Sequence, residues 1–334
     1  MKTNTKLKLS RLLSAELYSA VFLMVILLFL GIFAKGFYDM NNIMSIFNRF
    51  SYVLISAVGM NMIIITSNID ISAGALISAI CIIVAAMGKR GFNVGWLFLA
   101  AIIAGALLSS LNGLLIAKVK IPAIVATLST MLLLQGVLPM ISGGSIYDLP
   151  VSFTWLAFDA KLFGIIPSSI PIMLVIVIFL LVFMKYSKFS KKLYAIGNNA
   201  QGARLAGINV SRTIIITYII AGALYGVTAV IIATGSQRVT PTMANGMEMI
   251  FIASVVLGGT STAGGSGKLT GTVIGALILS IISPAINYMG INSDWSDAVM
   301  GAIIILSVIA GALNFKKRRK LSVVNKVKLG GQAL

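Results

Sequence analysis

An acidic residue interrupts a long apolar run at position 70. The segment 66–74 has the sequence TSNIDISAG, and Asp70 is the only acidic residue between Asp39 and Asp148. A carboxylate beside hydrocarbon is costly unless it accepts hydrogen bonds or reaches water. Asp70 is placed to cap a following helix, because its side chain can accept from the exposed N–H groups of the next residues. We predict a capped turn between helices or a helix break that lines a polar path, and the two are compatible. The candidate path residues of this segment are Ser67, Asn68, Asp70, Ser72 and Gly74.

A glycine-rich segment follows an apolar run near residue 257. Residues 258–267, GGTSTAGGSG, hold five glycines in ten positions, which suggests a phosphate-binding loop. Such a loop requires Gly-Lys followed by Ser or Thr after a β-strand, whereas Leu269 follows Lys268 here. The glycines are more consistent with close helix packing and a sharp turn. They add Gly258, Gly259 and Thr260 to the candidate path residues.

A polar, basic loop lies at 185–212 between two apolar stretches. Asn199 can cap a short helix that runs from Ala200 to Ala206, and Gly207 can end it. A structured, largely uncharged helix in such a loop is typical of a docking surface for a partner, and an ordinary connecting loop is the alternative. The candidate docking residues are Gly197, Asn198, Asn199, Ala203, Arg204, Leu205 and Gly207.

Apolar helices must position these residues, because at least nine hydrophobic stretches run through the chain almost end to end. A helix needs ~20 apolar residues to cross ~30 Å of hydrocarbon, and its backbone must satisfy its own hydrogen bonds there. Hydrophobic residues make up 58% of the chain and charged residues 10%, against ~25% charged residues in soluble domains. The sequence therefore predicts an all-α, polytopic membrane protein. The stretches are 17–34, 48–66, 71–87, 93–117, 121–142, 164–184, 213–234, 268–289 and 296–314.

The basic residues predict the orientation of these stretches. If a tenth crossing lies among residues 247–263, both termini are cytoplasmic and the inner segments hold 20 of the 26 Lys and Arg residues, as the positive-inside rule requires. Most acidic residues, Glu248 among them, then fall outside or near the outer face. The pair Lys89-Arg90 fits this map poorly, so a broken or re-entrant pair at 48–66 and 71–87 is the alternative.

This map divides the chain into three parts. Residues 1–16 form a cytoplasmic N-terminus, 17–314 a membrane domain with the cytoplasmic loop 185–212, and 315–334 a basic cytoplasmic tail. The net charge is +18, but the basic residues flank membrane stretches, which favours contact with lipid headgroups over nucleic acid. A single cysteine, Cys81, and the absence of histidine leave no metal framework and remove the commonest general base. We therefore expect neither a metal nor an enzyme.

Three segments resemble the permease subunits of bacterial ATP-binding-cassette importers for simple sugars, the ribose, xylose, arabinose and galactose group. Residues 59–74 (GMNMIIITSNIDISAG) are similar to that family's Gly-Met, apolar run and Ser-Gly-Gly-Ile-Asp-Leu-Ser-Val-Gly pattern. Residues 189–208 are similar to its cytoplasmic loop, and 253–275 to its glycine-rich segment. Residues 120–128 (KIPAIVATL) add a weaker match, and together the resemblance spans roughly 15–315.

The resemblance implies a fold of about ten transmembrane helices, of the vitamin B12-importer type (type II). It implies that two permeases, identical or different, pair around a central path for a monosaccharide, a pentose or a hexose, in the bacterial inner membrane. Two cytoplasmic ATPases would bind ATP-Mg beneath them, so this chain binds no cofactor, and an extracytoplasmic binding protein would deliver the sugar. The helix at 199–207 would be the coupling helix that sits in a groove of the ATPase. The chain departs from the family at Ser67-Asn68, where two glycines are usual, and at Asn198-Asn199, where Gly-Asn is usual.

Other functions remain alternatives at this point. The same superfamily includes permeases for autoinducer-2, nucleosides and branched-chain amino acids. A secondary transporter driven by ions would place titratable residues near the bilayer midplane, whereas the mid-span regions predicted here lack Glu, Lys, Arg and His, and Asp70 and Asp297 fall near span ends. An intramembrane enzyme would need a histidine, a paired carboxylate or a serine with a base, and no such arrangement is recognisable.

Overall fold

The computed structural model of the chain describes residues 15–146, 166–236 and 238–292, together with 149, 150, 153, 161, 162, 295, 298, 299, 301, 302 and 305. The predicted tail, most of the predicted N-terminal segment and most of the last apolar stretch lie outside these residues. The described segments are helical apart from a two-stranded antiparallel pair, β1 (Lys161–Leu162) and β2 (Ile166–Pro167), and one isolated bridge between Ile146 and Val239. The predicted helical architecture agrees with this structure.

Six of the described helices are long and apolar enough to cross a membrane. They are α3 (Met40–Ile65), α5 (Val94–Leu114) with its π-helical extension η1 (Leu115–Val119), α6 (Ala123–Ser142), α7 (Ser169–Tyr186), α10 (Val210–Thr234) and α12 (Leu269–Tyr288). Three further apolar helices are α2 (Ala15–Phe33), α4 (Ala73–Lys89) and α11 (Met247–Leu257). Two polar helices, α8 (Lys188–Asn198) and α9 (Ala200–Leu205), complete the described elements.

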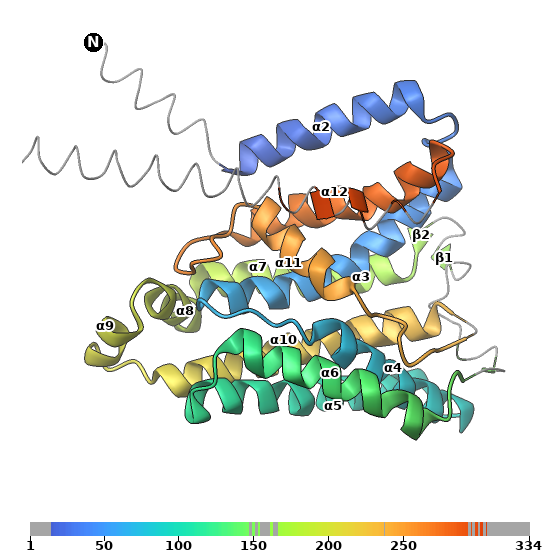
Figure 1. The fold of residues 1–334 in the computed structure, drawn as a ribbon. Coiled ribbons are helices and arrows are strands. Elements are labelled where there is room, and N and C mark those ends of the chain that lie inside the picture. Colours follow the sequence, from blue (N-terminus) through green and yellow to red (C-terminus); the bar gives the residue numbers. More distant parts are fainter. Residues whose placement is uncertain are drawn as a thin grey trace, which may run out of the picture.

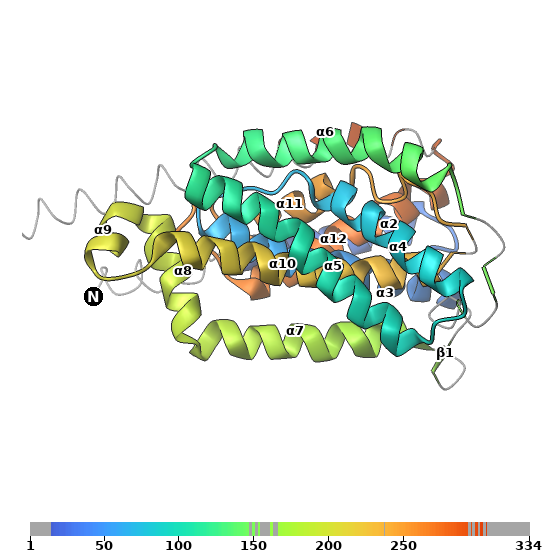
Figure 2. The same cartoon turned by 90° about the horizontal axis from the view of Figure 1, so that it is seen from below.

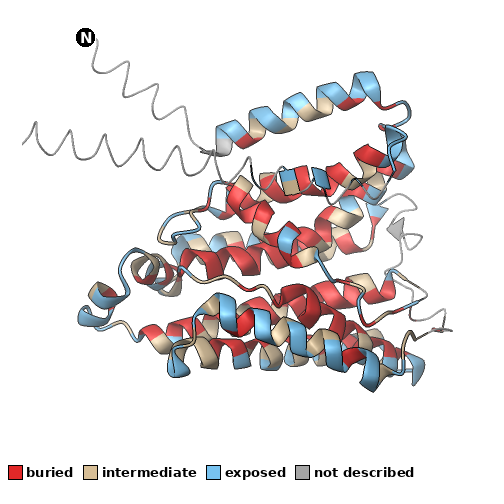
Figure 3. Cartoon of the chain, in the orientation of Figure 1, coloured by how far each residue is buried: buried red, intermediate tan, exposed pale blue. Residues whose placement is uncertain are grey.

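The apolar helices run side by side, with α8 and α9 projecting at one end and the strand pair at the other (Figure 1). We call these ends the α9 end and the strand end. Helices α3, α10 and α12 form the centre, and at least 61% of the most apolar part of each is buried inside the protein. Helices α6 and α7 flank the bundle, and at most 22% of the corresponding part of each is buried (Figure 2). The exposed side chains of the flanking helices are themselves apolar (Figure 3). A bundle with an apolar exterior is what a hydrocarbon solvent requires.

The chain breaks its helical path between α3 and α4. Helix α3 ends near α8 at the α9 end, and residues 66–72 then return into the bundle before α4 begins (Figure 1). The start of α4 lies beside the middle of α10, because the Tyr218 hydroxyl donates to Ile69 O at 3.3 Å. Farther along, the Cys81 thiol donates to Ala229 O. The alternative of a broken pair at 48–66 and 71–87 therefore agrees with the structure, although α3 begins earlier than expected, at Met40.

The second break lies where the sequence predicts a tenth crossing. Only Met247–Leu257 is helical in the predicted span 247–263, and these 11 residues extend ~16 Å at ~1.5 Å per residue, about half of the hydrocarbon thickness. The chain leaves α10 at the strand end, descends through residues 235–246 and starts α11 inside the bundle, and α11 then runs toward the α9 end (Figure 1). The predicted stretch 247–263 is therefore helical only over Met247–Leu257, and the chain passes through the rest of the bundle without a helix, along residues 235–246. Turn-forming residues and glycines limit the helix to half the depth.

The two breaks are related by an inverted repeat of packing. In this repeat α3 corresponds to α10, α4 to α11 and α5 to α12. Helix α3 packs on α12, and its counterpart α10 packs on α5. Helix α4 packs on α10, and its counterpart α11 packs on α3. Helix α4, with 17 residues, and helix α11, with 11, run in opposite directions, and each starts within the bundle (Figure 1). Their N-termini consequently approach one another from opposite sides, because a buried side chain of α11, that of Glu248, lies directly against Gly74 at the start of α4.

Glycines allow the tightest contacts of this core. A Cβ atom on Gly105 of α5 would clash with the carbonyl oxygen of Gly222 on α10, and one on Gly275 of α12 would clash with that of Ser254 on α11. Small residues at such positions let helix backbones approach closely in an apolar solvent, where van der Waals packing drives association. The glycines therefore set the spacing of the helices that hold the two breaks.

Candidate functional site

Three of the predicted segments meet at the α9 end. The Ser67 hydroxyl, in the break after α3, lies 3.1 Å from Gly197 O in α8 and 2.8 Å from Ala263 O in the glycine-rich loop. The Asn198 side chain donates to Gly265 O at 3.0 Å, and Gly265 N donates to Ile65 O at 2.9 Å. We call the residues Ser67, Gly197, Asn198, Ala263 and Gly265 the junction. It joins the predicted docking loop directly to both predicted path segments.

Local backbone geometry explains the residue types at the junction. Ser67 has φ 63°, the left-handed region that L side chains rarely adopt. A Cβ atom on Gly197 would clash with Ile65 O, and one on Gly265 would crowd the Asn198 side chain. Ser67 and Asn198 are the positions where the family resembled above usually carries glycine. In this chain both side chains donate hydrogen bonds across the junction, which offsets the strain at Ser67.

A tyrosine extends the junction along α8. The Tyr194 hydroxyl donates to Gly267 O at 2.9 Å. Burial raises the pKa of this phenol, so it stays a neutral donor at physiological pH. No sequence signal singled out this residue, because the partner carbonyl is 73 positions away in the chain.

The short helix α9 confirms the predicted caps. Asn199 Oδ1 accepts from Gly202 N at 2.9 Å, and Gly207 follows the helix with φ 79°. The helix ends at Leu205, one residue before the predicted Ala206. Ala203 faces inward and is buried, whereas Arg204 is exposed and Leu205 is 91% exposed. The Leu205 side chain is therefore accessible on the helix that the sequence predicts as a docking surface.

Asp70 accepts hydrogen bonds just before α4, inside the bundle, but the N-cap residue of α4 is Ser72 rather than the predicted Asp70. Its Oδ1 atom accepts from Ser72 N at 3.0 Å and from the Ser72 hydroxyl. The Asn112 side chain of α5 donates to Ser72 Oγ at 2.8 Å, and the Thr130 hydroxyl of α6 donates to Asn112 Oδ1 at 2.6 Å. This chain of hydrogen bonds ties the break to two neighbouring helices, and it fixes Asp70 Oδ1 as an acceptor.

Glu248 overturns two expectations. The sequence places it in or near an outer loop, but the structure buries it in the first turn of α11, with 5% of its surface exposed. Its Oε2 atom lies against Gly74, beside Ala244 O. The interior of the bundle therefore does contain acidic side chains, since Asp70 and Glu248 are both buried there. Hydropathy could not reveal this, because the position of a half-length helix depends on long-range packing.

The candidate path residues divide into two groups. Ser67 and Gly259 are exposed and Asn68 is half-buried, all toward the α9 end. Asp70, Ser72, Gly74, Gly258 and Thr260 are buried inside the chain. Thr260 Oγ1 accepts from the Asn61 side chain of α3 at 2.7 Å. Asn61 and Asn112 were not among the candidates, although an amide within an apolar helix is a usable signal for a functional position.

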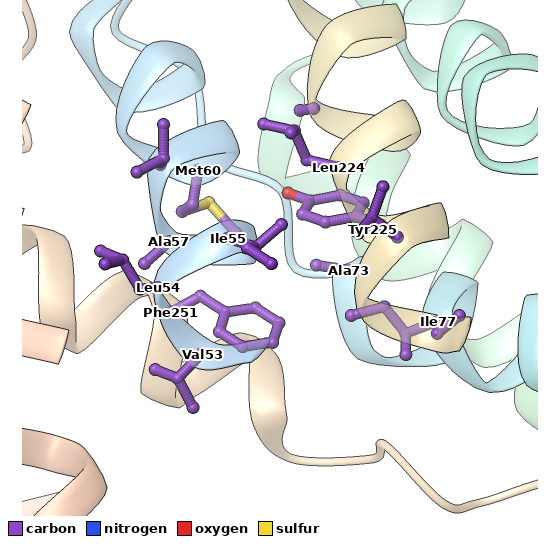
Figure 4. Packing of buried hydrophobic residues seen from close by; sticks show 14 of the residues in the cluster. Val53, Leu54, Ile55, Ala57, Met60, Ala73, Ile77, Leu224, Tyr225 and Phe251 are labelled. Carbon is purple, nitrogen blue, oxygen red and sulfur yellow. The ribbon is translucent and has the colours of Figure 1, made fainter. Parts of the chain in front are cut away.

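A tyrosine and a phenylalanine pack above the start of α4. Tyr225 extends from α10 toward α3, and Ala73 lies beside it (Figure 4). Its ring stacks on Phe251 of α11 with centroids 6.5 Å apart. The Tyr225 hydroxyl is buried without a hydrogen-bond partner in the described part of the chain, close enough to Asp70 to interact with it electrostatically.

Comparisons with known proteins place this arrangement among transport proteins. Residues 42–308 match the family described as "Branched-chain amino acid transport system / permease component". The chain is 33% identical to the ribose import permease protein RbsC of Escherichia coli, over 88% of this chain and 92% of that protein. It is 32% identical to RbsC of Bacillus subtilis, over 86% and 89% of the two chains. It is 31% identical to the autoinducer 2 import system permease protein LsrC of Yersinia enterocolitica, over 90% and 81%. No solved structure matches the chain.

Proposed function

Because the chain belongs to the family of branched-chain amino acid transport system permease components, we propose that it is the membrane-spanning subunit of an importer for a monosaccharide. The observation that carries this proposal is the similarity to ribose import permeases of two distantly related bacteria along nearly the whole chain. The same similarity favours a pentose over a hexose. Autoinducer-2 is the second candidate, because a permease for that compound is almost as similar.

The energy for import comes from a partner in this proposal. The glycine-rich segment lacks the Gly-Lys-Ser/Thr order of a nucleotide-binding loop, because Leu269 follows Lys268. In this proposal a cytoplasmic ATPase therefore holds ATP-Mg, and this chain binds no cofactor. The α9 end faces the cytoplasm, and both termini lie on that side of a bacterial inner membrane. A binding protein delivers the sugar at the strand end, and a second permease, identical or different, completes the path within a type II arrangement of about ten helices.

Helix α9 acts as the coupling helix in this mechanism. The exposed Leu205 and Arg204 enter a groove of the ATPase, and Asn199 and Gly207 keep the helix at a defined length. The ATPases close on ATP and release on hydrolysis, and the resulting displacement of α9 reaches Gly197 and Asn198 next. From there the junction transfers it to Ser67 and the break before α4, and to the glycine-rich loop after α11.

The candidate path residues serve mainly as moving parts in this proposal. Five of them are buried among helices of one chain, so they hold and steer α4 and α11: Asp70, Ser72, Gly74, Gly258 and Thr260. Ser67, Asn68 and Gly259 remain the candidates for a lining near the α9 end. Alternating access then results from rocking of α4 and α11 around their starts.

Uptake of labelled ribose tests the proposal. Cells that express this permease with the ATPase and binding protein encoded beside it should accumulate the sugar only while ATP is available. Removing the ATPase should abolish accumulation. Accumulation that persists without the ATPase and collapses with the ion gradient would instead assign the chain to the secondary transporters. Competition by unlabelled autoinducer-2, but not by pentoses, would select the second candidate substrate.

A further inference from the structure

One buried amide holds both ends of the glycine-rich loop. Asn61 of α3 has 0% of its surface exposed. Its Nδ2 atom donates to Thr260 Oγ1 at 2.7 Å and to Thr272 Oγ1 at 2.8 Å. Thr260 lies just after α11, and Thr272 lies in the first turn of α12. The segment between the two threonines is therefore tied at both ends to a single side chain of a third helix.

The contacts that join the glycine-rich loop to the junction and to α8 lie between these two threonines. Backbone oxygens of Ala263, Gly265 and Gly267 accept hydrogen bonds from side chains of α8 and of the break after α3. The loop is also braced internally, since Ser261 N donates to Ser266 O at 3.0 Å. A displacement of α8 therefore moves the loop as a body, and the two ends of the loop receive the pull.

Asn61 adds α3 to a pair of helices that already touch. A Cβ atom on Gly258 would clash with the backbone of Gly271, so the end of α11 and the start of α12 are in direct contact without it. Helix α3 meets the loop at two depths. At its last residue, Ile65 O accepts from Gly265 N at 2.9 Å, and Asn61 lies one turn deeper on the same face of α3.

Stability alone does not account for an asparagine at this position. An unpaired polar atom in the interior is costly, and Asn61 Oδ1 is buried without a hydrogen-bond partner in the described part of the chain. A leucine of similar shape would occupy the same space without that oxygen. The two donated bonds are therefore the property that distinguishes Asn61 from an apolar side chain.

We propose that Asn61 is a positioning residue for transport, which makes the ends of α3 and α11 and the start of α12 move as one unit. This inference rests on the proposed coupling through α8 and α9. When α8 displaces the glycine-rich loop, the amide passes the movement from Thr260 and Thr272 to α3. Because the break before α4 directly follows α3, one movement of the loop reaches both α4 and α11.

Sugar transported per ATP hydrolysed tests this role in the full chain, reconstituted with its ATPase and binding protein. Asn61→Leu should keep sugar-stimulated ATP hydrolysis near the parent rate and lower the transport per ATP several-fold, because the loop still moves but no longer carries α3 with it. Thr260→Val and Thr272→Val each remove one of the two bonds and should each lose part of the ratio. Adding either to Asn61→Leu should change nothing further, since the shared bond is already gone. The two valine variants carry the test by themselves if the leucine variant does not fold.

Thr228→Val is the matched control. Thr228 is also fully buried, and its Oγ1 atom accepts from Ser56 Oγ of α3 at 2.8 Å. This bond joins α3 to α10 and does not involve the loop, so its loss should leave the transport per ATP at the parent value even if the melting temperature falls. A parent ratio in Asn61→Leu, or an equal loss in Thr228→Val, would overturn the proposal.

Hydrogen exchange of the permease alone, in lipid nanodiscs, provides a readout that does not depend on transport. Asn61→Leu should speed the exchange of backbone N–H groups in residues 258–272, because a segment that loses its anchor opens more often. Thr228→Val should leave that segment unchanged. Unchanged exchange there in Asn61→Leu would refute the anchor, even in a complex that transports sugar. A parent complex without ATP-dependent uptake would refute the proposed function, and the exchange result would still decide whether Asn61 ties the loop to α3.

Discussion

At the scale of single residues, the two informative positions are Ser67, with its left-handed backbone, and the buried carboxylate of Asp70. Ser67 keeps a left-handed backbone that costs an L residue roughly 1–2 kcal/mol, and its hydroxyl reaches carbonyls of two other segments. Asp70 organises Ser72 and, through it, Asn112. Substitutions that remove either a hydrogen bond or the backbone strain can distinguish a role in transport from a role in stability.

Ser67→Ala and Ser67→Gly separate the hydrogen bond from the backbone strain. Both remove the hydroxyl, but only glycine relieves the positive φ. We expect the Ala variant to lose about 1 kcal/mol of stability and the Gly variant to stay near the parent, as measured by thermal unfolding in detergent. Both should lower the ratio of transport to ATP hydrolysis in the assembled complex. Equal melting temperatures for the two variants would mean that the backbone strain at Ser67 is negligible.

Asp70→Ala should impair the break before α4. The substitution leaves Ser72 N and the Ser72 hydroxyl without their acceptor, and a buried unsatisfied donor costs about 1–3 kcal/mol. We expect lower sugar uptake or a lower yield of assembled protein, measured as uptake per membrane-inserted permease. Asp39→Ala is the control, because Asp39 is exposed. Normal uptake at a normal protein level would remove Asp70 from the mechanism.

At the scale of elements, the spacing of the neighbouring helices decides whether α4 and α11 can start inside the bundle. The starts of α4 and α11 are held by α5, α10, α3 and α12, and glycines bring several of these backbones into direct contact. The junction then links α8 to the break before α4. A half-length helix leaves backbone groups unsatisfied at its inner end, so it depends on neighbours such as Ser72, Asn112 and Ser78 to supply partners.

Gly105→Ala tests this spacing. A methyl group there would clash with Gly222 O on α10, and overpacking of a buried contact typically costs about 1–3 kcal/mol. We expect a lower melting temperature and reduced uptake. Gly136→Ala on α6 is the matched control, because nothing lies within 4 Å of its added Cβ. It should be neutral or slightly stabilising, since alanine is the better helix former. The same loss at both positions would argue against a specific α5–α10 contact.

At the scale of the whole molecule, the proposed mechanism assigns ATPase docking to one end of the bundle and gating to its interior. The chain belongs to a permease family, and its apolar exterior suits contact with lipid. Helix α8 is connected with the interior breaks through the junction, through the Tyr194–Gly267 hydrogen bond and through its packing on α3 and α10. These contacts give motion of α9 a direct route to both breaks.

Leu205→Ala and Arg204→Ala test the docking role of α9. Leu205 is 91% exposed, so its truncation should leave the melting temperature of the isolated permease unchanged. It should weaken ATPase binding and reduce sugar-stimulated ATP hydrolysis several-fold, since truncating an anchor at an interface commonly costs about 2 kcal/mol or more. Lys191→Ala, on the exposed part of α8, is the control. Unchanged stimulated hydrolysis in the reconstituted complex would count against α9 as the coupling helix.

The sequence alone determined the local features of this protein. Eight of the nine apolar stretches coincide with described helices, and the ninth lies mostly outside the described residues. The cap at Asn199 also follows from residue type, because apolar runs and capping side chains act over a few neighbouring positions.

Only the tertiary structure decided how deep the broken segments lie and what they meet. It moved Glu248 from an expected outer loop to the interior, limited the helix in the expected span 247–263 to 11 residues and joined Ser67 to residues 130 and 196 positions away. Hydropathy indicates only that a segment is apolar, and an apolar helix such as α11 can be surrounded by lipid or by protein. The depth at which a half-length helix starts is set instead by the distant backbones and polar groups that satisfy its free end, and no local pattern encodes those partners.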